Sequence, residues 1–152
     1  MTKPPILLPP PPMALHEGEV ALGFTKIVYP ATRGLSPYYH FRILAGTKDV
    51  GHINLRVGES DHVRFVVGHV GYGIKQRHRG HRYALLACRA LAPFARTVTP
   101  EVVLTCDPEN HASRRTIERL VESDVAEEVS VPRHDPHYRS GARKKLRYRW
   151  IP

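Results

Sequence analysis

The residues just before position 83 form the densest group of basic and ionisable side chains in the sequence. They are Lys75, Arg77, His78, Arg79, His81 and Arg82, within the stretch "KQRHRGHR". A nearly unbroken apolar run, "YALLACRALAPFA", follows at once and predicts a buried helix. Helix N-termini bind phosphates, because the first turn carries unpaired N–H groups and the positive end of the helix dipole. This order of residues therefore predicts a phosphate site at the start of the helix.

Other phosphate motifs and metal ligation have less support. No stretch matches GxxxxGK[ST], and "GYGIKQ" lacks the third glycine of a dinucleotide fingerprint. The pairs His78/His81 and His134/His137 have a spacing that could hold a metal, but no third ligand converges on either pair. We therefore expect no metal site. Cys106 sits in an apolar strand pattern, which predicts a core residue rather than a nucleophile.

The basic side chains are concentrated in the second half of the chain. The first 74 residues carry seven Lys/Arg and five Asp/Glu, whereas the remaining 78 carry sixteen and nine, within a net charge of +9. Such an excess favours an anionic partner, either nucleic acid or a small molecule with several phosphates. The run "RSGARKKLRYRW" mixes basic and aromatic residues as a nucleic-acid surface would. We favour the alternative of an edge strand protected by charge, so nucleic acid is the less favoured partner.

Length and composition predict one globular domain. With 152 residues and 41% hydrophobic content, the chain can bury a core without cross-links. Cys88 and Cys106 lie in apolar stretches, which argues against disulfides and favours a reducing, cytoplasmic setting. The apolar part of the opening "MTKPPILLPPPP" is too short for a signal peptide or a membrane span. We therefore expect an extended proline-rich tail at 1–14, a single domain at 15–152 and no membrane association.

Hydrophobic periodicity predicts strands first and helices later. Alternation and β-branched or aromatic composition predict strands at residues 19–30, 38–44, 51–58 and 63–74. The apolar run predicts a helix at 80–96, and an amphipathic pattern predicts a second helix at 111–123. Shorter strand patterns occupy 101–106, 125–131 and 144–151. The sequence thus predicts an α+β domain.

Several of these stretches, taken in order, resemble the GNAT N-acetyltransferases. The loop "RGHRYA" is similar to that family's acetyl-CoA loop, [Q/R]xxGx[G/A], with Arg82 where glycine is usual. "LTCDPENHASRRTIERL" resembles the strand and helix that follow, and it places Asn110 at the family's asparagine beside pantetheine. "YHFRI", "GHINLR" and "RYRW" complete a set similar to a branch of the family marked by RGHxYA and TCDPxNxASRRTIERL. The resemblance implies a mixed, mainly antiparallel central sheet with helices packed on it.

The same resemblance implies acetyl-CoA as a co-substrate. Strand backbone would pair with pantetheine and the loop amides would bind the pyrophosphate, assisted by arginines. The implied cofactor-binding residues are Tyr72, Gly73, Ile74, Arg77, Arg79, Gly80, His81, Arg82, Tyr83, Ala84, Asn110 and Ser113. A residue in a first helical turn has an ordinary negative φ, so we expect Arg82 to fit this loop with its side chain pointing away.

The catalytic groups are less clearly marked than the cofactor site. Many family members protonate the leaving thiolate with a tyrosine on the later helix, and the matching residue here, Ile117, cannot donate a proton. The carboxylate base that is common in the family is also missing from residues 68–73. His69 is the nearest titratable group, and histidine ordinarily titrates near neutrality. His69 is therefore a candidate base and Tyr148 a candidate acid, although a strand histidine is more often structural.

Two classes of function remain open on this basis. The first is an N-acetyltransferase that moves an acetyl group from acetyl-CoA to an unidentified amine by direct attack on the thioester. The alternative is a divergent GNAT fold that binds acyl-CoA, nucleic acid or a protein partner without turnover. Arg82, Ile117 and the missing carboxylate motivate the alternative.

The spacing of the first strands predicts an uncovered sheet face. GNAT domains generally place two helices between the first two strands, yet only "ATRGLS" separates Pro30 from Pro37, so these helices should be reduced or absent. Two polar rows would share this face: Tyr38, His40 and Arg42 on one strand, and His52, Asn54 and Arg56 on the next. We hypothesise that the face receives an anionic acceptor or a second copy of the chain through Arg42 and Arg56. A plain solvated face is the alternative.

Overall fold

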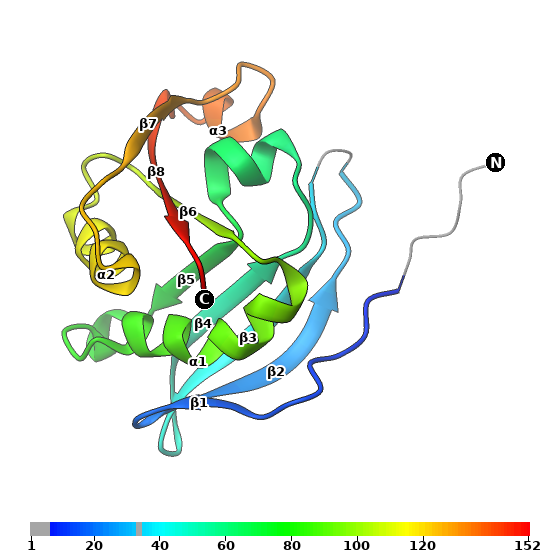
Figure 1. Ribbon diagram of the computed structural model, residues 1–152, viewed down its shortest axis with the longest axis vertical. Coiled ribbons are helices and arrows are strands. Elements are labelled where there is room, and N and C mark those ends of the chain that lie inside the picture. Colours follow the sequence, from blue (N-terminus) through cyan, green and yellow to red (C-terminus); the bar gives the residue numbers. More distant parts are fainter. Residues whose placement is uncertain (1–6, 33–34) are drawn as a thin grey trace.

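An antiparallel sheet of five strands forms the larger part of the protein (Figure 1). The computed structural model describes residues 7–32 and 35–152. The strands pair in chain order: β1 (Leu15–Glu17), β2 (Val20–Val28), β3 (Tyr38–Ala45), β4 (Lys48–Arg56) and β5 (Val70–Ile74). Alternation positions the core, because Tyr39, Phe41 and Ile43 of β3 are buried on one face while their neighbours lie on the other.

A second antiparallel sheet of three strands lies beside the first. Its order is β6 (Val102–Cys106), β8 (Lys144–Trp150) and β7 (Glu127–Ser130), with β8 in the centre. The resemblance implied one mixed central sheet, and the described residues instead form two sheets whose pairings are all antiparallel. Cys88 and Cys106 are both buried and free, as expected of core residues.

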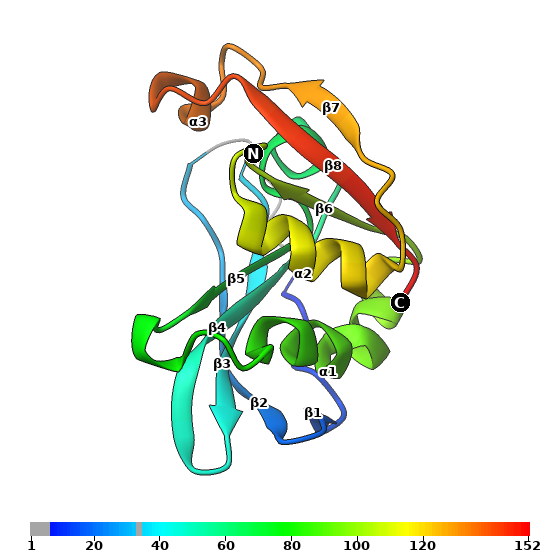
Figure 2. The same cartoon turned by 90° about the vertical axis from the view of Figure 1, so that its left-hand side faces the viewer.

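Two helices cover one side of these sheets (Figures 1 and 2). α1 (Tyr83–Val98) packs on the larger sheet and buries seven residues, as its apolar sequence predicts. α2 (His111–Val121) packs against α1 and β8 and buries only Ile117 and Leu120. A single turn, α3 (Pro136–Arg139), precedes β8. Among the helices of the described residues, none has the length and apolar character needed to cross a membrane.

The strand predicted over residues 63–74 is wrong in its first half. Val63–Val67 form a turn of π-helix, η1, and β5 begins only at Val70. Two buried valines of η1 are three residues apart, a spacing that suits a helical face. Gly68 ends the turn at φ 69°. The apolar run therefore changes from helical to extended geometry at a glycine.

The residues ahead of β2 are attached to the larger sheet. The N–H of Leu8 donates to the Tyr29 hydroxyl (2.9 Å), and the Tyr39 hydroxyl donates to the Pro9 carbonyl (2.7 Å). β1 was not predicted, because three residues are too few to show a period. Part of the expected tail, residues 1–6, lies outside the described residues, and the domain boundaries stay a prediction.

The segment between β2 and β3 leaves one face of the larger sheet without the expected family helices. Its described residues, 29–32 and 35–37, form no helix, which confirms the expected reduction. The register of β3 and β4 pairs the two polar rows across this face: Tyr38 with Arg56, His40 with Asn54, and Arg42 with His52. The prediction that these rows share a face is therefore confirmed.

Glu122 ends α2 in the left-handed conformation, with φ 55°. We expect Glu122→Gly to raise the free energy of unfolding by about 1 kcal/mol, because glycine adopts this conformation without steric cost. Thermal unfolding should show a rise in Tm of about 2–4 °C for a domain of this size. Glu122→Ala is the matched control and should give no gain. An equal gain in both variants would mean that loss of charge, rather than backbone conformation, produces the effect.

Candidate active site

β5 and β6, which belong to different sheets, come together near the start of β5 and then diverge (Figure 2). The N–H of His69, directly before β5, donates to the carbonyl of Val103 in β6 (2.7 Å). Beyond this bond β5 pairs with β4 and β6 pairs with β8, so the two strands diverge. The gap between them opens toward the N-termini of α1 and α2.

The backbone of β5 has polar groups that no neighbouring strand uses. Hydrogen bonds to β4 immediately before and after β5 fix the phase of the ladder. Because antiparallel bonds alternate along a strand, the backbone of Gly71 and Gly73 faces β4, while that of Tyr72 and Ile74 faces the gap. Arg79 Nε donates to the Ile74 carbonyl from this side (3.1 Å), which confirms the direction.

α1 begins at the gap without a capping side chain. Its N-cap residue, Arg82, makes no side-chain cap bond, and the first turn holds no acidic residue. The first intrahelical bond joins the Leu86 N–H to the Arg82 carbonyl (3.1 Å). The N–H groups of Tyr83, Ala84 and Leu85 therefore have no helical partner, and the positive end of the helix dipole lies at the gap.

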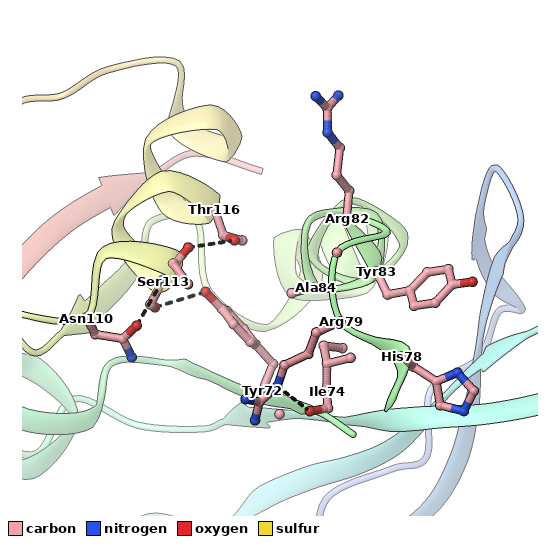
Figure 3. A pocket seen from close by; sticks show the side chains of 13 residues that line it. Tyr72, Ile74, His78, Arg79, Arg82, Tyr83, Ala84, Asn110, Ser113 and Thr116 are labelled. Atoms are coloured by element: carbon pink, nitrogen blue, oxygen red, sulfur yellow. Dashed lines mark hydrogen bonds between the residues drawn. The ribbon is translucent and has the colours of Figure 1, made fainter. Parts of the chain in front are cut away.

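A pocket of about 380 Å³ lies where the free edge of β5 meets the two helix N-termini (Figure 3). Ten predicted cofactor-binding residues line it: Tyr72, Gly73, Ile74, Arg79, Gly80, Arg82, Tyr83, Ala84, Asn110 and Ser113. The prediction missed three further lining residues, His78, Ala112 and Thr116. Arg77 and His81 do not line this pocket, and Arg77 instead borders a separate hollow. The described residues that line this pocket include no carboxylate.

Side chains of β5 and α2 provide hydrogen-bonding groups inside this pocket. The hydroxyls of Tyr72 and Ser113 lie 3.1 Å apart, and the Ser113 N–H donates to Oδ1 of Asn110, the N-cap of α2 (3.1 Å). Burial raises the pKa of Tyr72 well above its ordinary value. The phenol is therefore protonated at neutral pH, and its raised pKa makes it a weaker acid than an ordinary tyrosine.

His69 is buried and both of its ring nitrogens are engaged. Nδ1 accepts from the N–H of Val103 (2.9 Å), which places the ring proton on Nε2. That nitrogen lies 3.0 Å from a carboxylate oxygen of the exposed Glu59. A general base needs a free lone pair, and the lone pair of His69 is used by the backbone of β6. These contacts give His69 a role in joining the sheets, and its assignment as a base stays a prediction.

Tyr148 and Ile117 also lie outside the pocket lining. The Tyr148 hydroxyl donates to Glu118 Oε1 on α2 (3.2 Å), and burial raises its pKa. Ile117 packs in the core. The assignment of Tyr148 as an acid therefore stays a prediction that no contact with the pocket supports.

The histidine pairs with metal-like spacing have other surroundings. His78 lines the pocket, whereas His81 does not. The buried Asp135 lies 2.6 Å from Nδ1 of His62 and accepts from the His137 N–H at the start of α3 (2.8 Å). Within residues 7–32 and 35–152, no three His, Cys, Asp or Glu side chains gather closely enough to hold a metal.

Comparison with known families agrees with this arrangement. The family described as "Acetyltransferase (GNAT) domain" matches residues 10–120, which is more than half of the chain. The chain belongs to the GNAT acetyltransferase family. No curated protein matches the sequence.

Solved structures show the GNAT fold at low sequence identity. The acetyltransferase from Agrobacterium tumefaciens str. C58 is similar with a TM-score of 0.59 and 18% identity, covering 97% of this chain and 99% of that one. A GNAT-family acetyltransferase from Bacillus anthracis is similar with a TM-score of 0.52 and 18% identity, and the match covers 74% of this chain and 65% of that one. A third structure, of a probable acetyltransferase, is similar with a TM-score of 0.55 and 20% identity, and the match covers 75% of this chain and 62% of that one. This chain therefore spans less than two thirds of the length of two of these proteins. The predicted α+β GNAT-like fold is confirmed.

Arg82 differs from the expected backbone geometry of the GNAT loop. It precedes the first turn of α1 and has φ 61°, so the expectation of a negative φ is wrong. Glycine adopts this conformation freely, whereas a residue with a side chain adopts it at a cost. The guanidinium points away from the other labelled residues of the pocket, as expected (Figure 3). Arg82 thus carries backbone strain without filling the pocket.

We expect Arg82→Gly to raise the free energy of unfolding by about 1 kcal/mol, measured by urea denaturation, because it removes this strain. Arg82→Ala is the control, since it removes the same charge but keeps a Cβ at φ 61°. The alanine variant should show no comparable gain. If both variants gained equally, relief of repulsion among the loop cations would be the cause instead.

We expect His69→Ala to lower the free energy of unfolding by about 2–4 kcal/mol, because it leaves a cavity and an unpaired N–H at Val103. Glu59→Gln tests the other ring contact and should cost less than about 1 kcal/mol, since Glu59 is exposed. Urea denaturation measures both variants. Unchanged stability of His69→Ala together with lost acetyl transfer would instead support a catalytic role.

Proposed function

We propose that this protein is an acetyl-CoA-dependent N-acetyltransferase that transfers an acetyl group to an amine by direct attack on the thioester. One observation carries the proposal: the free edge of β5, the uncapped start of α1 and a basic loop line the same pocket. GNAT acetyltransferases use acetyl-CoA as co-substrate. The two free cysteines are compatible with the reducing cytoplasm, where we place the protein.

The start of α1 supplies the groups that a pyrophosphate requires. The unpaired N–H groups of Tyr83 and Ala84 border the pocket, and Arg79 adds a cation beside them. Each charge-assisted bond of this kind contributes roughly 1.5–3 kcal/mol. Arg77 and His81, outside the lining, would contribute through the positive field rather than by contact.

The free edge of β5 suits the amide-containing pantetheine arm. The backbone groups of Tyr72 and Ile74 would pair with these amides as they would with an added strand. Arg79 donates to the Ile74 carbonyl in the structure, so binding would exchange this bond for one to the ligand. Asn110 lies at the opposite wall, with Oδ1 already used in capping α2 and its amide N–H groups left to donate.

Among the residues that line the pocket, we propose Tyr72 as the proton donor. The protonated phenol of Tyr72 supports protonation of the departing thiolate better than Tyr148 does, because the Tyr148 hydroxyl is directed to Glu118. The pocket lining offers no carboxylate to accept the proton of the amine. We therefore propose that the acceptor amine reacts in its neutral form and releases its proton to solvent.

Calorimetry with coenzyme A tests the cofactor assignment directly. We expect binding, a ligand-dependent rise in melting temperature, and about tenfold to a hundredfold weaker binding by Arg79→Gln, because one charge-assisted contact is lost. Arg89→Gln is the control, since Arg89 is exposed on α1 outside the pocket and should not affect binding. The assignment is wrong if millimolar coenzyme A neither binds nor shifts the melting temperature.

Release of coenzyme A from acetyl-CoA in the presence of an amine panel tests turnover. The proposal expects release that depends on an added amine and on the pocket. Tight binding of coenzyme A without release for any amine would favour the alternative, a GNAT fold that binds acyl-CoA without catalysis.

A further inference from the structure

The polar face of the larger sheet carries two arginines whose surroundings differ. Arg42 of β3 and Arg56 of β4 lie in the polar rows that share this face. The sequence suggested the same role for both, as contacts for an anion. Their hydrogen bonds now separate them.

Arg42 already has a counter-ion. Its Nε and Nη2 donate to the two carboxylate oxygens of Asp49 (2.9 and 2.8 Å), and Lys75 lies 3.6 Å from the same carboxylate. The hydrogen bonds from Arg42 hold the pKa of Asp49 below its ordinary range, so this carboxylate is charged at neutral pH. Arg42 therefore already binds a carboxylate through its Nε–Nη2 edge, and Asp49 neutralises its charge.

Arg56 is anchored but has no counter-ion. Its Nη1 donates to the carbonyls of Val67 and Gly68 at the end of η1 (3.1 and 3.2 Å), which fixes the guanidinium. No acceptor among the described residues contacts its Nε or Nη2, and neither atom is shut off from solvent. This is the edge that Arg42 uses to bind a carboxylate. Arg56 thus presents an oriented, half-buried Nε–Nη2 fork without a carboxylate partner, and such a fork suits an oxyanion.

Two glycines of β5 make room for side chains of β4. A Cβ at Gly71 would lie 2.9 Å from Nη2 of Arg56, so the guanidinium rests directly on the strand backbone. A Cβ at Gly73 would lie 2.7 Å from the ring of His52. Burial lowers the pKa of His52, so this ring is neutral at neutral pH and adds no second positive charge beside Arg56.

The fork lies across β5 from the proposed pantetheine site. Gly71 and Tyr72 are consecutive, and alternate residues of a strand face opposite sides, so Arg56 and the Tyr72 side chain flank the same strand. A β-strand rises about 3.3 Å per residue. β5 is the edge strand of the larger sheet, so its side away from β4 is free. A molecule anchored on Arg56 therefore needs only a short spacer to place an amine at that edge.

We infer that Arg56 selects the acceptor: its Nε and Nη2 bind a carboxylate or phosphate of a substrate whose amine reaches the free edge of β5. The inference rests on the proposed function for the amine and the acetyl group. The binding of the oxyanion rests on Arg56 alone. The acceptor is accordingly a small molecule or chain end that carries an amine a few bonds from an anionic group.

Nuclear magnetic resonance of protein labelled with ¹⁵N-arginine tests the anion site without requiring turnover. The Nε–H signal of Arg56 is assigned by its absence in Arg56→Lys, and that of Arg42 by its absence in Arg42→Lys. β-Alanine and O-phosphoethanolamine are the probes, with β-alaninamide and ethanolamine as analogues that lack the anion. We expect a saturable shift of the Arg56 signal with the anionic probes only, and no shift of Arg42. The stronger of the two probes distinguishes a carboxylate from a phosphate.

An Arg56 signal that does not respond to either anion at tens of millimolar overturns the inference, whatever the protein does with acetyl-CoA. Equal shifts with the analogues overturn it as well, because the amine would then be the group recognised. A third outcome against it is an oligomer that Arg56→Gln dissociates in sedimentation, since the face would then be a subunit contact.

Kinetics with the same probes tests the link to acetyl transfer. We expect Arg56→Gln to raise KM for the anionic acceptors by about tenfold to a hundredfold, with affinity for coenzyme A unchanged. Arg56→Lys keeps the charge without the fork and should fall between Arg56→Gln and the unmodified protein. Arg42→Gln is the control and should leave these KM values unchanged, and melting temperatures check that each variant folds. If the rate of acetyl transfer depends neither on the anionic group of the acceptor nor on Arg56→Gln, this inference alone is overturned. If the unmodified protein does not bind coenzyme A, the proposed function is overturned.

Discussion

The contact between His69 and Val103 sets the geometry on which the candidate site depends. The backbone N–H and the ring Nδ1 of His69 bond to the carbonyl and the N–H of the same residue, at 2.7 and 2.9 Å. Gly68 makes this approach possible, because a Cβ there would lie 2.7 Å from the Val103 carbonyl oxygen. Within the described residues, β5 pairs with β4 and has no strand partner on its other side beyond this contact. A longer ladder between β5 and β6 would close the gap and remove the pocket.

The backbone groups at the unpaired edge of β5 lack hydrogen-bond partners from a neighbouring strand. Buried backbone groups are nearly always paired, so the outward-facing groups of Tyr72 and Ile74 need partners. Arg79 supplies one of them from the loop that precedes α1. The same side chain borders the unpaired N–H groups at the start of that helix. Arg79 therefore lies between the free backbone groups of β5 and the unpaired N–H groups at the start of α1. A ligand with amides and phosphates that displaced Arg79 would form hydrogen bonds to both sets of groups.

Local patterns in the sequence were sufficient for the fold class, whereas the resemblance to the GNAT family supplied ten of the residues that line the pocket. The alternation of apolar and polar residues around Phe41 and the apolar run of α1 are each contained within a single element. The "RGHRYA" stretch follows β5 and runs into the start of α1. The π-helical turn was missed because periodicity alone does not distinguish a short apolar run such as "VRFVV" from a strand. The left-handed backbone of Arg82 was missed because residue type alone does not give the sign of φ. The role of His69 depends on a partner 34 residues away, which no local pattern contains.

The same limit explains why the two arginines of the polar face looked equivalent. Both stand in alternating strands, and only the fold brings Asp49 to Arg42 and the end of η1 to Arg56. The glycines of β5, which in the sequence indicate a loosened strand, have a specific consequence in the structure. They remove side chains from one face of β5, where the Arg56 guanidinium then rests on the backbone, while Tyr72 on the other face borders the pocket. Glycine within a strand weakens it, and packing of β4 side chains over Gly71 and Gly73 offsets that loss. The fixed cation of Arg56 on β4 and the free backbone edge of β5 therefore lie beside consecutive residues, Gly71 and Tyr72, and the proposed placement of an anion and an amine of one acceptor depends on this closeness.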